Sequence, residues 1–237
     1  MSEAVVQVED LDVYYGTSQI LFGVGLSVRQ GETLALLGRN GAGKSTTLKA
    51  IIGLVRATAG SVSFAGRRID ALPPFQIARL GLGYVPEERR IFTDLTVMEN
   101  LEVGRQPPRE GAPTWTPERL FELFPNLGRM RDRPGGRMSG GEQQMLTIAR
   151  TLMGNPKAVL LDEPSEGLAP VIVEGIANTI LELKREGLCI VLCEQNLHFA
   201  QLVADRATII EKGQIRYTGT MTELNANAAA REQYLSV

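Results

Sequence analysis

The sequence predicts an α/β protein with a mostly parallel sheet, a β-rich N-terminal part and an inserted helical segment. Strand-like apolar runs alternate with helical stripes, the opening residues favour strands and turns, and the pattern changes between residues 87 and 155. Alternation of strand and helix implies a parallel sheet covered by helices. We expect a single domain over residues 1–237, in which 1–86 and 156–237 form the β-subdomain and the core, and 87–155 form a helical subdomain.

The composition of the chain limits which partners and which cellular compartment we expect for it. Hydrophobic residues make up 43% of the chain, charged residues make up 22%, and the formal charge is −2. That charge gives no electrostatic reason to expect nucleic acid as a partner, and the arginines between 129 and 137 are interpreted as a solvated face. No apolar run approaches the roughly 20 residues of a membrane helix, and no signal peptide is visible. We therefore expect a cytosolic protein that reaches a membrane only through a partner.

Short strands are predicted along the first part of the chain. The run Thr33–Leu37 is nearly all apolar, as expected for a strand that is buried on both faces. Apolar residues recur at helical spacing from Leu48 to Val55, so the glycine-rich segment in between joins a strand to a helix. The other strands expected here are Val5–Val8, Leu11–Tyr14, Gly23–Val28, Ser61–Phe64 and Leu82–Val85.

Helical signals dominate the middle of the chain, and strands return after it. Helices are predicted at Thr96–Leu101, at Pro117–Phe124 with Thr116 as its N-cap, along the stripe from Met145 to Leu152, and in the Ala226–Ala230 tail. Strands are predicted at Val159–Leu161, Leu188–Leu192 and Ala207–Ile210, with a helix between the first two. Cys189 and Cys193 are ~13 Å apart along a strand, beyond the reach of a disulfide, so we interpret both as core residues.

The segment between the all-apolar strand and its helix matches the Walker A pattern. Glycines let backbone N–H groups surround a polyphosphate closely, and the following helix adds its partial positive charge. Lys44 suits the β and γ phosphates, and the Ser45 hydroxyl suits Mg²⁺. A glycine-rich turn with an incidental lysine is the alternative. The residues predicted to bind ATP here are Gly38, Arg39, Asn40, Gly41, Ala42, Gly43, Lys44, Ser45 and Thr46.

Two acidic residues follow a second buried strand. Asp162 and Glu163 come directly after Val159–Leu161, at the carboxyl end of the sheet where ligands bind in open α/β proteins. Asp162 suits Mg²⁺, directly or through water, and Glu163 could orient and deprotonate an attacking water. Adjacent acids at a strand end are often only a solvated turn. Together with the Walker A loop they favour catalysis of phosphoryl transfer.

A third motif, from Met138 to Gln144, places Ser139, Gly140 and Gly141 at the start of a helix. Backbone donors and a serine hydroxyl in this position can meet an anion, although a plain N-cap is the alternative. The motif resembles the signature of ATP-binding cassette (ABC) ATPases, in which Walker A, signature and Walker B follow in this order. The resemblance runs from about Val5 to Gly219. It implies a P-loop NTPase core with an N-terminal antiparallel β-subdomain and an inserted helical subdomain.

What the resemblance implies can be assigned residue by residue. Tyr15 resembles the aromatic residue that stacks on adenine, with strand packing as the alternative. Ser139–Gly141 would contact the γ-phosphate of a nucleotide held by the opposite subunit, so two ATP molecules would lie at a dimer interface. Ser165–Leu168 corresponds to the loop that crosses to the partner. The resemblance therefore implies ATP and Mg²⁺ as ligands and a dimer of ATPase subunits, either identical or different.

Two positions depart from the commonest pattern of the family. Glu87 replaces the glutamine that senses Mg²⁺ and touches the membrane subunit, and a carboxylate can still bind Mg²⁺. Gln195 replaces the switch histidine, and its amide can donate to a γ-phosphate but cannot change its charge. His198 is expected on a helix surface rather than as the switch. Activity should therefore lack a histidine titration near neutral pH.

These departures are similar to one branch of the family, the ATPase subunits of branched-chain (hydrophobic) amino acid importers. The motifs that carry this similarity are Val85–Glu87, Gly141–Leu146, Gly167–Pro170 and Glu194–Asn196. The branch implies two membrane permease subunits, a soluble binding protein and a position at the cytoplasmic face of the membrane. Relatives that move urea, amides or other small solutes are an alternative. A soluble ABC ATPase acting on nucleic acid or ribosomes and a non-hydrolysing nucleotide-gated module are less favoured, the latter because Asp162 and Glu163 are present.

Overall fold

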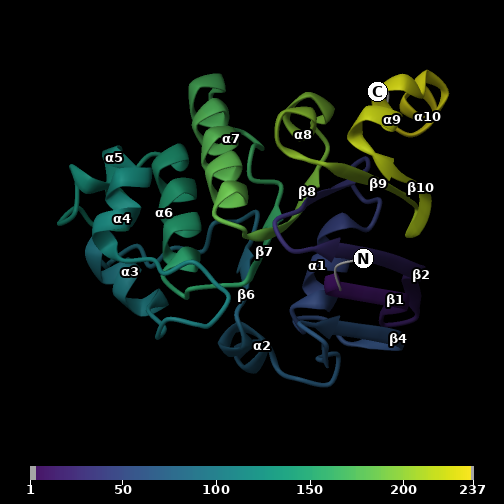
Figure 1. Cartoon of the computed structure of the whole chain (residues 1–237), viewed down its shortest axis with the longest axis horizontal. Coiled ribbons are helices and arrows are strands. Elements are labelled where there is room, and N and C mark those ends of the chain that lie inside the picture. The colour runs from purple at the N-terminus through teal and green to yellow at the C-terminus, as the bar shows by residue number, and fades with distance from the viewer. Residues whose placement is uncertain (1–3, 236–237) are drawn as a thin grey trace.

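The computed structural model describes residues 4–235, which fold into two β-sheets with helices around them (Figure 1). The first sheet is antiparallel, with the strand order β2-β1-β4-β5. Its strands are β1 (Ala4–Tyr15), β2 (Ser18–Arg29), β4 (Ala57–Phe64) and β5 (Arg67–Arg68). This is the antiparallel N-terminal β-subdomain that the family resemblance implies.

The second sheet has six strands in the order β10-β9-β3-β8-β7-β6. All of its neighbours pair in parallel except β9 and β10, which form an antiparallel edge. Its strands are β3 (Thr33–Leu37), β6 (Leu82–Val85), β7 (Ala158–Asp162), β8 (Cys189–Glu194), β9 (Arg206–Glu211) and β10 (Gln214–Thr220). The predicted fold class, α/β with a mostly parallel sheet, is confirmed.

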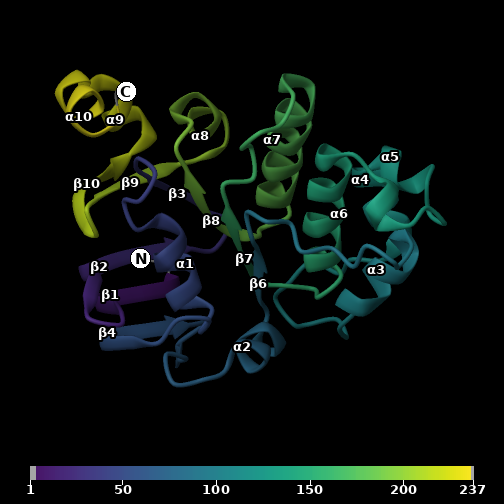
Figure 2. The ribbon, with the colours of Figure 1, turned by 180° about the vertical axis from the view of Figure 1, so that it is seen from behind.

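Alternating side chains of the parallel strands fill two different cores. Leu34 and Leu36 of β3 face α1 (Lys44–Ile51) and the antiparallel sheet, whereas Ala35 and Leu37 face the other way. This period of two is what a strand buried on both faces requires. The far face is covered by α7 (Pro170–Arg185), α8 (Leu197–Val203), α9 (Met221–Ala226) and α10 (Ala228–Tyr234). The helix α1 therefore lies between the two sheets (Figure 2).

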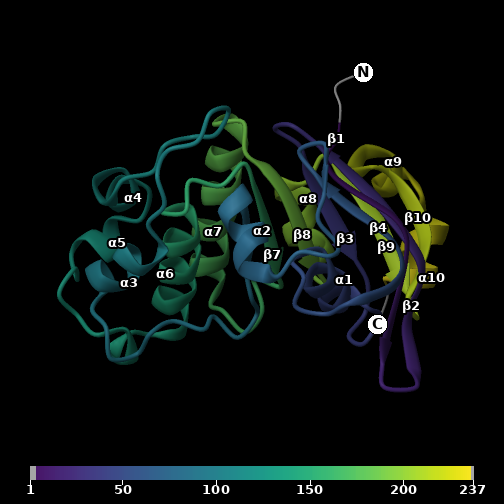
Figure 3. The ribbon, with the colours of Figure 1, turned by 90° about the horizontal axis from the view of Figure 1, so that it is seen from below.

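The remaining helices gather at one end of the molecule, away from β1, β2 and β4 (Figure 3). They share a core in which the apolar stripe of α6 packs on α3, on α5 and on the strand β6. These elements are α3 (Val97–Gly104), α4 (Pro117–Leu123), α5 (Pro125–Gly128), the 3₁₀ turn Gly135–Arg137 and α6 (Gly140–Leu152). A separate helix, α2 (Pro74–Leu80), leads into β6. No helix within residues 4–235 is long and apolar enough to cross a bilayer.

The structure differs from the sequence prediction mainly in how strands continue. Asp10 has a φ of +48° and lies where β1 shifts register against its neighbours, so the two strands predicted at 5–8 and 11–14 are one bulged strand. The helix α2 and the strand β10 were not predicted. Both are short and largely exposed, so their apolar pattern is weak. Cys189 and Cys193 are free and buried on one face of β8, as predicted.

Candidate nucleotide-binding site

The loop between β3 and α1 has a backbone that only glycine fits at two points. A Cβ atom on Gly38 would lie 2.4 Å from the carbonyl oxygen of Ile210, and Gly43 has a φ of +113°. Gly43 is also the N-cap of α1 and has no side chain to occupy the helix's first N–H groups. Those groups therefore stay directed at the loop, the arrangement that binds phosphates at helix N-termini.

Lys44 is the buried cation of this loop. Its side chain is 3% exposed, and its Nζ atom donates to the carbonyl oxygens of Gly38 at 2.8 Å and Arg39 at 3.1 Å. The same Nζ lies 2.9 Å from Oε1 of Glu163. The loop carbonyls thus hold the ammonium group in place, and Glu163 is the anion that incoming phosphate oxygens would have to replace.

Ser45 and Asp162 come together from elements 117 positions apart in the sequence. Ser45 Oγ donates to Asp162 Oδ1 at 2.8 Å, and Tyr84 donates its hydroxyl to Asp162 Oδ2 at 3.0 Å. Tyr84 reaches the carboxylate because β6 and β7 are parallel neighbours. Burial raises the pKa of Asp162 against the opposing effect of these two hydrogen bonds. Asp162 also raises the pKa of Tyr84, together with burial, so this hydroxyl stays a donor.

This oxygen pair fits the needs of Mg²⁺ at a nucleotide. Among residues 4–235, no group of three or more His, Cys, Asp or Glu side chains is arranged to hold a metal ion. Mg²⁺ at phosphate sites needs only one or two protein oxygens, because phosphate and water oxygens complete its octahedral shell. Ser45 and Asp162 supply a hydroxyl and a carboxylate next to the phosphate loop, which is the expected donor set.

Glu163 occupies a strained position beside a second carboxyl. Its φ is +47°, a left-handed conformation that is uncommon for a residue with a Cβ and that recurs at functional sites. Burial alone would raise its pKa, but hydrogen bonding from Glu166 and the charge of Lys44 lower it overall. The hydrogen bond to Glu163, with burial, raises the pKa of Glu166 to about 7. Below about pH 7 the proton of this pair therefore lies on Glu166 and the negative charge on Glu163.

A cavity of about 480 Å³ opens beside these groups. Asn40 of the phosphate loop, Glu163 and Gln195 all line it. Gln195 is exposed just after β8, whereas the preceding Glu194 is buried and accepts backbone N–H bonds from Ser165 and Asn196. Glu194 thereby fixes the turn from which Gln195 projects. His198 is exposed on α8, the surface position that the sequence predicts.

Two other predicted residues, Tyr15 and Glu87, are exposed in the folded chain. Tyr15 is 48% exposed at the end of β1, so its ring is not used in strand packing. Glu87 follows β6 and is exposed, and its pKa is raised by partial burial and by the charges of Glu163 and Asp162. The carboxylates of Glu87, Asp162 and Glu163 therefore repel one another, and a cation bound between them would reduce this repulsion.

The residues Ser139–Gly141 lie elsewhere, at the N-terminus of α6 in the helical end of the molecule (Figures 1 and 3). Ser139 is the N-cap, its Oγ accepts the N–H of Glu142, and the Glu142 carboxylate accepts the N–H of Ser139 at 2.7 Å. Within residues 4–235, no hydrogen bond joins this segment to the phosphate loop. The fold thus brings together Lys44, Ser45, Asp162 and Glu163, and keeps the Ser-Gly-Gly segment apart from them.

Sequence reasoning gave no role at this site to three residues that shape it. These are Tyr84, Glu166 and Glu194, of which the last two were named only as parts of family motifs. Tyr84 could have been found, because adjacent parallel strands bring their carboxyl ends to the same sheet edge. Glu166 gave no signal, because its contact with Glu163 depends on the left-handed turn at Glu163 itself. Glu194 reads as a polar strand end, and its burial becomes visible only in the folded chain.

Comparison with known proteins gives a consistent result. Residues 21–166 match the family model described as "ABC transporter". The chain is 43% identical to the high-affinity branched-chain amino acid transport ATP-binding protein BraG of Pseudomonas aeruginosa, covering 96% of this chain and 97% of that protein. It is 36% identical to the lipopolysaccharide export system ATP-binding protein LptB of Haemophilus influenzae, covering 98% and 97%. Both similarities therefore extend over nearly the whole length of the two chains compared.

Solved structures agree with the sequence matches. The fold superposes with a TM-score of 0.82 on the ADP conformation of MJ1267, described as an ATP-binding cassette of an ABC transporter. The two proteins are 29% identical over 98% of this chain and 97% of that one. The antiparallel subdomain, the mixed sheet and the helical end are therefore features of a known architecture.

Proposed function

The chain belongs to the ABC transporter family as its ATP-binding and ATP-hydrolysing subunit, and we propose that it energises the import of branched-chain or other hydrophobic amino acids. The observation that supports the chemistry is the meeting of Lys44, Ser45, Asp162 and Glu163 at one sheet edge, with contacts of 2.8–2.9 Å. The resemblance to ABC ATPases that the motifs predict is confirmed by the family match. The import of amino acids is supported by the 43% identity to BraG.

The phosphate loop would bind the triphosphate through groups that are already in position. Residues 38–46 present backbone N–H groups and the N-terminus of α1, and Lys44 would exchange Glu163 for the β- and γ-phosphates. Ser45 and Asp162 would hold Mg²⁺, which would neutralise charge on the phosphates. Tyr84 would keep the carboxylate of Asp162 oriented. Tyr15 would stack on the adenine from the end of β1.

Glu163 would act as the general base once Lys44 has turned to the phosphates. Its lowered pKa keeps it ionised at neutral pH, and its left-handed backbone aims it into the cavity that Gln195 lines. The water that it deprotonates would attack the γ-phosphorus, and its proton would pass to the carboxylate. The bond from that phosphorus to the β–γ bridging oxygen would break, which releases ADP and inorganic phosphate. Gln195 would donate its amide to the γ-phosphate, and Glu87 would lie near the metal side of the site.

Closure of a dimer would complete the site. Within residues 4–235, no hydrogen bond or ion pair joins the Ser139–Gly141 segment to the phosphate loop of its own chain, and we assign the segment to a nucleotide on a second ATPase subunit, identical or different. ATP would then bridge the two subunits, and loss of the γ-phosphate would let them separate. Only in the closed dimer would the triphosphate contact both the phosphate loop of one subunit and the Ser139–Gly141 segment of the other.

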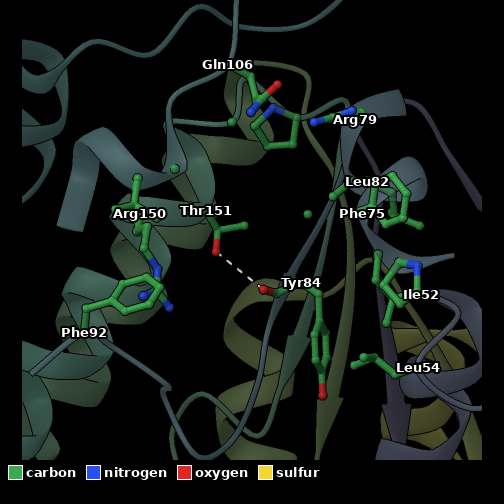
Figure 4. Close-up of a pocket in the computed structure, with 17 residues that line it drawn as sticks. Ile52, Leu54, Phe75, Arg79, Leu82, Tyr84, Phe92, Gln106, Arg150 and Thr151 are labelled. Carbon is green, nitrogen blue, oxygen red and sulfur yellow. Dashed lines mark hydrogen bonds between the residues drawn. The ribbon is translucent and has the colours of Figure 1, made fainter. Parts of the chain in front are cut away.

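A groove of about 500 Å³ between α2, β6, α3 and α6 supports docking to a membrane subunit (Figure 4). Phe75, Phe92 and Val103 are 47–58% exposed around it, which is unusual for side chains of this size. An apolar segment of a permease would cover them. We therefore propose two permease subunits and a binding protein as partners, with the chain at the cytoplasmic face of the membrane through the permeases.

The test of the ATPase mechanism uses Glu163→Gln. This variant is expected to bind ATP, to hydrolyse it slowly and to run as a dimer in size exclusion with ATP and Mg²⁺. A Lys44→Ala variant, which should not bind the triphosphate, is the matched control and should stay monomeric. A monomeric Glu163→Gln protein at saturating ATP-Mg²⁺ would contradict the dimer mechanism.

The cargo is tested in cells that lack the chain. Uptake of labelled leucine is expected to fall and to return with the wild-type chain but not with Lys44→Ala. The LptB relative at 36% identity supports export of lipopolysaccharide as the second candidate. That candidate predicts unchanged leucine uptake with lipopolysaccharide retained at the inner membrane, and urea or amide uptake lost alone would point to the related importers.

A further inference from the structure

The guanidinium group of Arg89 lies against the first glycine of the Ser139–Gly141 segment. A Cβ atom placed on Gly140 would be 2.7 Å from Arg89 Nη1 and 3.3 Å from Cζ, so the guanidinium group lies directly against this glycine. Arg89 is half-buried and belongs to the loop that follows β6, five positions after Tyr84. The loop beside the metal side of the site therefore reaches the N-terminus of α6.

The backbone of this loop is fastened to α6. Thr147 Oγ1 donates to the carbonyl oxygen of Arg89 at 2.9 Å, and Arg150 donates to that of Arg90 at 2.7 Å. The Arg150 guanidinium also packs over the ring of Phe92 (Figure 4), 5.1 Å from the ring centre. Arg89 itself has a φ of +64°, so these bonds hold it in a conformation that it would rarely adopt alone. The backbone from which the Arg89 side chain extends is therefore fixed to α6.

The charge of Arg89 has no partner in the described part of the chain. Within residues 4–235, its guanidinium forms no hydrogen bond or ion pair, whereas the neighbouring Arg90 lies 3.4 Å from Glu88. The carboxylate of Glu142 is already used by the N–H of Ser139. A half-buried cation therefore lies next to the positive end of a 13-residue helix. An anion bound between Arg89 and this helix N-terminus would be stabilised by both.

We propose that Arg89 is a phosphate-binding residue of the Ser139–Gly141 half-site. Its planar fork would bond to terminal phosphate oxygens of the nucleotide held by the second subunit, next to the hydroxyl of Ser139 and the N–H groups of Gly140 and Gly141. This inference rests on the proposed dimer mechanism. Arg89 would thereby add a charged contact to the γ-phosphate. Because Arg89 belongs to the loop between Glu87 and the groove residue Phe92, binding of the γ-phosphate would act directly on that loop.

The test measures how much ATP is needed to form dimers. In the Glu163→Gln protein with Mg²⁺, Arg89→Ala is expected to raise the ATP concentration for half-maximal dimerisation by about tenfold or more, as loss of a charged hydrogen bond implies. Arg90→Ala is the matched control, because that residue is exposed, has a φ of +49° and pairs only with Glu88. It should leave the concentration unchanged. Arg89→Lys, which keeps the charge and loses the fork, should fall between the two.

A second measurement separates this contact from damage to the fold. ATP affinity of the monomeric Arg89→Ala protein, at concentrations below dimerisation, should equal that of its parent because its own phosphate loop is intact. Equal ATP requirements for the parent and Arg89→Ala would overturn the inference, as would an equal shift in Arg90→Ala. Failure of the Glu163→Gln parent to dimerise at any ATP concentration would instead reject the proposed dimer mechanism and this inference with it.

Discussion

The two ends of the molecule differ in how complete their chemistry is. At the phosphate-loop end, Lys44 is 3% exposed and Asp162 is 1% exposed, and each is held by contacts within the chain. At the helical end, the Ser139 cap is exposed and is satisfied only by its own Glu142, while Arg89 beside it is unpaired within residues 4–235. One end is a preassembled cradle, and the other is a set of donors that its own chain does not use.

The two ends therefore have different roles: the buried groups of the phosphate loop bind a ligand within one chain, and the exposed donors of the helical end are available to a ligand on another chain. A cradle that binds its ligand alone gains from rigid internal contacts, because the cost of ordering is met during folding. Donors meant for a ligand on another molecule must stay accessible until the two meet. Substitutions at the phosphate-loop end should therefore change ATP binding or hydrolysis, and substitutions at the helical end should change ATP-dependent dimerisation.

The largest effect is expected at Glu163, in the phosphate-loop end of the molecule. Glu163→Gln should lower ATP hydrolysis by about 10²–10⁴-fold, the range for loss of a general base, because an amide cannot accept the proton from water. Binding of ATP to the monomer should persist, since Lys44 keeps its two loop carbonyls. Single-turnover hydrolysis and equilibrium binding measure the two quantities. A variant that keeps most of the wild-type rate would assign the base elsewhere.

The helical end is next, and the chain supplies an internal control for it. Ser139 and Thr96 are both N-caps in capping boxes, so Ser139→Ala and Thr96→Ala should each cost about 1 kcal/mol of stability. Only Ser139→Ala should also raise the ATP needed for dimerisation of the Glu163→Gln protein, by roughly 10–100-fold. Sedimentation analysis across an ATP titration checks this. Equal behaviour of the two variants would mean that Ser139 is a helix cap alone.

Tyr84 tests whether the cradle is held in place by residues behind it. Tyr84→Phe removes the hydroxyl that lies 3.0 Å from Asp162 Oδ2 and leaves the ring. The Mg²⁺ concentration for half-maximal ATPase activity should rise by about tenfold, the scale for loss of a residue that orients a metal ligand. The ATP affinity measured without Mg²⁺ should not change. A lower maximal rate with an unaltered Mg²⁺ requirement would contradict this role.

The smallest effect concerns pH. The pKa of Glu166 is about 7 in the folded chain and near its ordinary value when unfolded, so the folded state holds a proton that the unfolded state releases. The stabilisation is therefore present at low pH and is lost as pH rises through about 7. Tm should fall between pH 6 and pH 8 more for the wild type than for Glu166→Gln. His198→Ala should keep the wild-type pH dependence, and a loss of that dependence in His198→Ala would contradict the assignment.

Much of this organisation follows from local pattern. The all-apolar run 33–37 and the glycines at 38 and 43 predict a strand, a tight loop and a helix, because few other backbones suit them. Thr96 and Thr116 as N-caps predict the starts of α3 and α4. The sequence pattern fails where long-range contact decides, as for the exposed edge strand β10 and the bulge at Asp10.

The motifs of the site could be predicted from the sequence, but the contacts between residues of different motifs could not. The ion pair of Lys44 with Glu163 and the contact of Arg89 with Gly140 join residues that are 119 and 51 positions apart. Neither spacing has a local signature, because each depends on which strands and helices become neighbours. The raised pKa of Glu166 is a property of the folded electrostatics rather than of any motif.

The most direct test is the crystal structure of the Glu163→Gln protein with ATP and Mg²⁺. We expect two nucleotides between two subunits. Each should have its phosphates on residues 38–46 of one copy and its γ-phosphate within hydrogen-bond distance of Ser139–Gly141 of the other. A structure in which Ser139 faces no phosphate, either in its own copy or in the neighbouring one, would contradict the claim that each ATP is completed by two chains.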